Sequence, residues 1–102
     1  MTAEEIVRGT KKIVSKIVEK VPAGHYFDSH YVINEMVANK NWIAAYVRFV
    51  AHYTGDKDSL ATGNGQIARL IKQQRVKKIS DKSISRTTHG GSPPCTLWKK
   101  LP

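Results

Sequence analysis

The sequence lacks the marks of a secreted, membrane-spanning or metal-stabilised protein. Only Cys95 of the 102 residues is a cysteine, which excludes an internal disulfide framework and a thiolate-rich zinc site. No apolar run approaches the roughly 20 residues that a membrane-spanning helix needs. The first 20 residues mix glutamates with lysines, so we expect neither a signal nor a transit peptide. The length suits a single domain over residues 1–102, in a reduced, cytoplasmic protein.

Acidic residues are also scarce, and they are unevenly placed. The chain has 17 Lys and Arg against 8 Asp and Glu, a net charge of +9. Residues 1–59 hold eight basic and seven acidic residues, whereas residues 60–102 hold nine basic residues and one acidic residue. Clustered Lys and Arg bind polyanions by releasing counterions, so the C-terminal part is expected to face a polyanion. The alternative is a basic surface that only keeps the protein in solution.

Apolar spacing predicts three helices in the first half of the chain. Residues 2–21 carry valine and isoleucine on one face, with a capping box at Thr2 and Glu5. Their heptad-like recurrence makes this helix a candidate dimerisation element. After a short connection at 24–28, a second helix is expected to begin at Asp28 or Ser29, with Asp28 as a candidate N-cap, and to run to about residue 38. A third is expected from about 42 to 53, with Val47 among its core-facing residues.

The second half is expected to contain a loop, a short helix and a β-hairpin. Gly, Ser, Asn and Asp over 56–65 predict the loop. Apolar residues at positions 67, 70 and 71 predict a helix from about 65 to 74, capped by Thr62 or Asn64. β-Branched residues over 76–79 and 83–88, and the segment 95–99, predict strands around a Gly/Pro turn that includes Pro94. The fold class is therefore α+β and mainly helical.

The predicted order from residue 28 is helix, helix, helix, strand, strand. This order resembles the winged helix-turn-helix DNA-binding domain over residues 26–101, with 2–21 as an extra N-terminal helix. The resemblance implies a three-helix core with a C-terminal β-hairpin. It also implies that the third helix enters the major groove and that the hairpin, or wing, touches the neighbouring DNA backbone. Residues 89–98 also resemble the ends of small bacterial and phage proteins of unknown function.

The resemblance, carried over to this sequence, predicts a DNA-binding surface on the 64–74 helix and on the wing, residues 84–98. The residue types suit that role, because Asn and Gln pair with adenine, Arg pairs with guanine and Lys neutralises phosphate. The candidate residues are Asn64, Gln66, Arg69, Lys72, Gln73, Lys77, Lys78, Arg86, Thr88 and His89.

No group of residues points to catalysis, a metal or a cofactor. His25 and His30 lie on either side of Asp28, but no third ligand has a known zinc spacing. Cys95 shares the hairpin with His89, and nothing near them in the sequence would orient or activate the thiol. We therefore expect a non-enzymatic protein with no cofactor.

Three functions stay open at this stage. The first is duplex DNA binding by a cytoplasmic, nucleoid-associated protein, with a homodimer as one arrangement. The second is a protein-interaction module of phage or mobile-element origin, whose basic end docks on an acidic protein partner. The third is RNA binding. The salt dependence of DNA binding and competition by RNA separate them.

Overall fold

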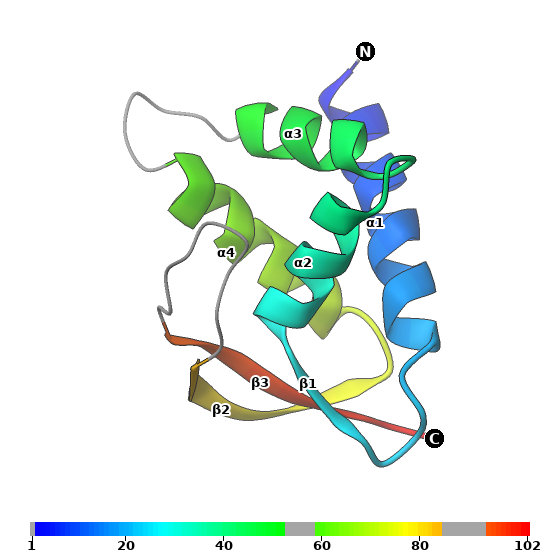
Figure 1. Cartoon of the computed structure of the whole chain (residues 1–102), viewed down its shortest axis with the longest axis vertical. Helices are drawn as coiled ribbons and strands as arrows, with labels where there is room; N and C mark the ends of the chain where they lie inside the picture. The colour runs from blue at the N-terminus through cyan, green and yellow to red at the C-terminus, as the bar shows by residue number, and fades with distance from the viewer. Residues whose placement is uncertain (1, 53–58, 85–93) are drawn as a thin grey trace.

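The computed structural model of the chain describes residues 2–52, 59–84 and 94–102, with side chains over 2–52, 65–80 and 95–102. These residues form four helices and a three-stranded antiparallel sheet, so the prediction of a mainly helical α+β fold is confirmed. Figure 1 shows the helices gathered on one side of the sheet, in which β3 lies between β1 and β2.

Helix α1 (Ala3–Glu19) begins at the predicted capping box. The Thr2 hydroxyl accepts the Glu5 backbone N–H at 3.2 Å, and the Glu5 carboxylate accepts the Thr2 N–H at 3.4 Å. On its inner face Val14, Ile17 and Val18 are buried against the other helices. The C-terminal half of the apolar stripe therefore packs in the core of the chain itself and is not exposed to form a dimer interface.

A short strand precedes the second helix, where the sequence predicts only a connection. Strand β1 (Tyr26–Asp28) pairs antiparallel with β3 (Pro94–Lys100). Three residues are too few to show an alternating pattern, and the partner strand lies about 70 positions away, so local sequence gives no signal. Helix α2 (Ser29–Ala38) follows at once, with the Asp28 side chain accepting the Tyr31 N–H at 2.8 Å as predicted for an N-cap.

Helix α3 (Ile43–His52) packs across α1 and α4 with one narrow stripe of side chains. Tyr46, Phe49 and Val50 are buried, but Val47 is 58% exposed, so the prediction that Val47 faces the core is wrong. A helix turns about 100° per residue, so a stripe centred on Tyr46 and Phe49 leaves position 47 on the flank.

Helix α4 (Ser59–Lys72) is longer than the sequence predicts. The expected loop at 56–65 is wrong from Ser59 onward, because those residues are already helical. Gly63 and Gly65 each disfavour a helix by about 1 kcal/mol. Once the buried turns at Ile67 and Ile71 have nucleated the helix, each further residue adds a hydrogen bond, and the helix extends through these glycines.

The C-terminal hairpin consists of β2 (Val76–Ile84) and β3. Two short strands were expected at 76–79 and 83–88, but the structure has one strand as far as Ile84. Its pairing with β3 contains two register shifts. Pro94 was expected in the turn, but it pairs with Ile84 as the first residue of β3. Proline is tolerated at that position because its missing N–H breaks no bond inside the ladder.

Trp98 joins the sheet to the helices. It lies on β3 between Phe27 of β1 and Lys78 of β2, and it is 3% exposed. Its indole N–H donates to the Ser29 hydroxyl at 3.1 Å, so the polar atom of this large apolar side chain is satisfied inside the core. Trp98 therefore packs in the core.

We expect this buried hydrogen bond to be measurable in a double-mutant cycle. Ser29→Ala leaves the indole N–H without its acceptor and should cost about 1–3 kcal/mol of unfolding free energy. Combining it with Trp98→Phe should cost less than the sum of the two single changes, by about 1 kcal/mol. Urea unfolding followed by circular dichroism measures each variant, and strictly additive losses would contradict the coupling.

Candidate nucleic-acid interface

The last three turns of α4 divide into a buried and an exposed side. Ile67, Leu70 and Ile71 are buried, as the sequence predicts. Around the rest of the helix, Gln66 is half-buried and Arg69, Lys72 and Gln73 are exposed. Because residues three and four apart lie on one helix face, Gln66, Arg69 and Lys72 form one polar strip along α4, and Gln73 lies in the turn that follows.

The polar strip leads directly into the hairpin. The Gln73 and Gln74 N–H groups donate to Leu70 and Ile71 at 3.3 and 2.9 Å, which closes the last turn of α4. Strand β2 starts two residues later, at Val76. The Arg75 carbonyl accepts the Leu101 N–H at 2.9 Å, so this connection is held against the end of β3.

Exposed cations follow one another along the chain here. Lys77 and Lys78, both predicted site residues, are exposed on β2, and Arg75 is exposed just before them. Lys77 is opposite Lys99 and Lys78 is opposite Trp98, so the two lysines are on opposite faces of the strand. Arg75 was not among the predicted site residues, although its charge is visible in the sequence.

The electrostatics of this surface have one sign. Residues 65–80 contain five basic residues and no acidic one. Arg69 and Lys72 lie in the last turn of α4, where a positive charge also offsets the negative end of the helix dipole. Arg75, Lys77 and Lys78 lie beyond the helix, so the dipole does not account for them. We call the group of polar and basic residues at the end of α4 and the start of β2 the basic corner: Gln66, Arg69, Lys72, Gln73, Arg75, Lys77 and Lys78.

Four predicted site residues are not part of the basic corner. Arg86, Thr88 and His89 lie outside the described residues. Asn64 lies within α4 rather than at its start, because the helix begins at Ser59, and its side chain is outside the described part. The idea that Asn64 caps the helix is therefore wrong, and the amides at 63–65 do not form a phosphate cradle at a helix N-terminus.

The described residues contain no group of three His, Cys, Asp or Glu side chains that would hold a metal. None of their helices combines the length and the apolar character needed to cross a membrane. Partial burial, and secondarily the Glu35 carboxylate, raise the pKa of Tyr31 above its ordinary value, so this hydroxyl stays protonated at neutral pH.

The fold and the basic corner define a small α+β protein with a cationic helix-hairpin surface. Comparison of the chain with protein-family models, curated proteins and solved structures found no match in any of the three.

The extension of α4 predicts the effect of replacing Gly65. A Cβ at Gly65 meets no atom within 4 Å, so Gly65→Ala should stabilise the protein by about 0.5–1 kcal/mol, as alanine does inside a helix. Gly24→Ala is the contrasting variant, because Gly24 has φ +84° and a side chain there is strained by about 1–2 kcal/mol. Thermal unfolding tests both, and a destabilising Gly65→Ala would argue that position 65 is not helical.

Proposed function

We propose that this chain is a non-enzymatic protein that binds duplex DNA through α4 and the β2–β3 hairpin. The observation that carries the proposal is the basic corner. The polar helix strip is followed along the chain by three further exposed cations, Arg75, Lys77 and Lys78, and residues 65–80 contain no acidic residue. Nucleic-acid phosphates favour such clusters because each contact releases condensed counterions.

The helix strip has the side chains that would contact base edges. Helix α4 has 14 residues, a length of about 21 Å, and the DNA major groove is about 12 Å wide, so one face of the helix fits in it. Gln66 and Gln73 would pair with adenine, and Arg69 with guanine O6 and N7. Lys72 would neutralise a phosphate and help to fix the orientation of the helix.

The hairpin would hold the helix in place on the duplex. Lys77 and Lys78 follow α4 on β2, at positions where they would contact the backbone beside the groove. In this proposal Arg86, Thr88 and His89 extend the contact from the wing. The observed order α2, α3, α4, β2, β3 supports the resemblance to winged helix-turn-helix domains on which the wing assignment depends. A DNA-binding role also implies a cytoplasmic protein associated with the nucleoid.

Binding to mixed-sequence duplex DNA should weaken steeply with salt. If four of the five cations in the basic corner each neutralise a phosphate, log K should fall with log salt at a slope of about −4. Affinity should then drop about a hundredfold or more between 50 and 200 mM salt. Fluorescence anisotropy of a labelled duplex measures this, with RNA of the same sequence as competitor. No binding at 50 mM salt, or stronger competition by RNA than by DNA, would contradict the proposal.

Arg69 should contribute sequence preference as well as charge. A preferred site is first selected from a randomised duplex library. Arg69→Ala should then lose about 10- to 100-fold affinity for that site, as expected when an arginine–guanine pair is removed. Arg69→Lys should lose the preference but keep most of the affinity for mixed-sequence DNA, because the charge remains.

Arg8→Ala is the matched control for Arg69. Arg8 is also an exposed arginine on a helix, but it lies on α1 outside the basic corner. Its loss removes the same charge and should change affinity for the selected site by no more than about twofold. Equal losses for Arg8→Ala and Arg69→Ala would mean that net charge alone drives binding.

A further inference from the structure

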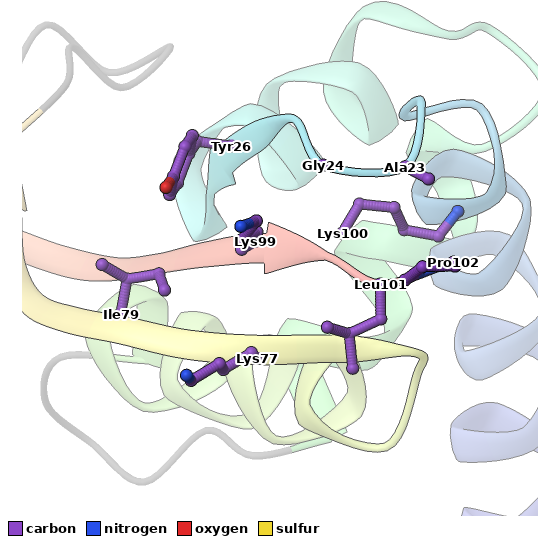
Figure 2. A pocket seen from close by; sticks show the side chains of 9 residues that line it. All are labelled: Ala23, Gly24, Tyr26, Lys77, Ile79, Lys99, Lys100, Leu101 and Pro102. Carbon is purple, nitrogen blue, oxygen red and sulfur yellow. The ribbon is translucent and has the colours of Figure 1, made fainter.

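The sheet carries exposed apolar side chains on the face turned away from the helices. Tyr26, Ile79 and Leu101 are 58, 42 and 37% exposed. Together with Lys77, Lys99 and Lys100 they line a hollow of about 630 Å³ across the three strands (Figure 2). We call it the sheet hollow. It differs from the basic corner because apolar side chains form much of its lining.

A cross-strand row places two lysines beside a tyrosine in this hollow. In the sheet register Tyr26 of β1 is opposite Lys99 of β3, which is opposite Lys77 of β2. The Lys99 ammonium lies 5.8 Å from the centre of the Tyr26 ring. Like charges directly opposite on paired strands destabilise a sheet, so Lys77 and Lys99 repel each other until an anion lies between them.

Strand alternation places Ile79 on the same face as Lys77, two residues earlier. A β-bulge also occurs here: Lys78 pairs with Trp98 and Ser80 pairs with Leu97, so β2 has one extra residue at that point. Here Ile79 lies on the open face of the sheet beside Lys77 and Lys99, as Figure 2 shows.

The other end of the hollow is fixed in place. The Lys100 ammonium donates to the Val21 carbonyl at 3.2 Å, and the Lys100 carbonyl accepts the Gly24 N–H at 2.8 Å. Leu101 is held by its N–H bond to Arg75 at 2.9 Å. The end of the hollow formed by Lys100 and Leu101 is therefore held in place before a ligand binds, which lowers the entropy cost of binding there.

We propose that the sheet hollow binds an acidic peptide segment of a partner protein, with an apolar side chain on the floor and carboxylates against Lys77 and Lys99. Charge complementarity favours this partner, because none of the residues lining the hollow is acidic. Single-stranded nucleic acid is disfavoured. Its bases stack on flat aromatic faces, whereas Ile79 and Leu101 are branched aliphatics and the Lys99 ammonium already lies over the ring of Tyr26.

This inference does not depend on DNA binding, and its test avoids the residue that the two surfaces share. Lys77 belongs both to the sheet hollow and to the basic corner, so the variants are Lys99→Gln and Ile79→Ser. Both positions face away from the core, and circular dichroism confirms folding. The matched controls are Lys12→Gln, an exposed lysine on α1, and Val47→Ser, an exposed apolar residue on α3.

The experiment is a selection of random dodecapeptides on the whole chain, followed by titration of the enriched peptides. We expect peptides with Asp or Glu beside Leu, Phe or Trp, and amide chemical shifts that change at Tyr26, Ile79, Lys99 and Leu101. Affinity should fall at least fivefold in Lys99→Gln and Ile79→Ser and stay within twofold in the two controls.

Several results would overturn this inference. They are enrichment of neutral or basic peptides, no enrichment, or shifts that map to another surface. Larger shifts of the hollow with oligothymidylate than with the acidic peptides would assign it to single-stranded nucleic acid instead. The duplex binding of Lys99→Gln and Ile79→Ser, measured in parallel, distinguishes failure here from failure of the DNA-binding proposal.

Discussion

The central strand β3 is the constraint on which the described fold depends. Strands β1 and β2 are joined only through it, and it brings the last residues of the chain against segments near positions 25 and 75. Its Trp98 side chain anchors the sheet to α2 through the buried bond to Ser29. A strand at the C-terminus therefore fixes the relative position of elements formed much earlier in the chain. It also holds the turn between α4 and β2, because Leu101 donates to Arg75.

Because β3 fixes both β1 and β2, one sheet supports two surfaces of different chemistry. The basic corner lies where α4 ends and β2 begins, and it is polar and cationic. The sheet hollow lies on the opposite side of the sheet from the helices and combines cations with apolar side chains. Lys77 belongs to both. A strip of Gln, Arg and Lys suits phosphates and base edges, whereas an apolar floor between lysines suits an acidic peptide.

Local signals in the sequence predict much of this fold, and non-local contacts explain where they fail. The Thr2–Glu5 box and the Asp28 cap act over three residues, so their spacing alone predicts the helix starts. Strand β1 exists because β3 pairs with it, and three residues are too few to show the alternation that would predict a strand. The start of α4 could not be predicted, because the residues around Gly63 and Gly65 have the composition of a loop. The polar side of α4 was predictable from Ile67, Leu70 and Ile71, whereas the sheet hollow depends on the register of the three strands.

We propose that duplex DNA binds at the basic corner, and mapping the residues that respond to DNA tests this most directly. The measurement is a titration of ¹⁵N-labelled protein with a short mixed-sequence duplex at low salt, followed by amide and Arg side-chain shifts. The account predicts that the largest changes occur at Gln66, Arg69, Lys72 and Lys77. Larger changes around Lys11, Lys12 and Lys16 on α1, or no saturable change at all, would contradict it.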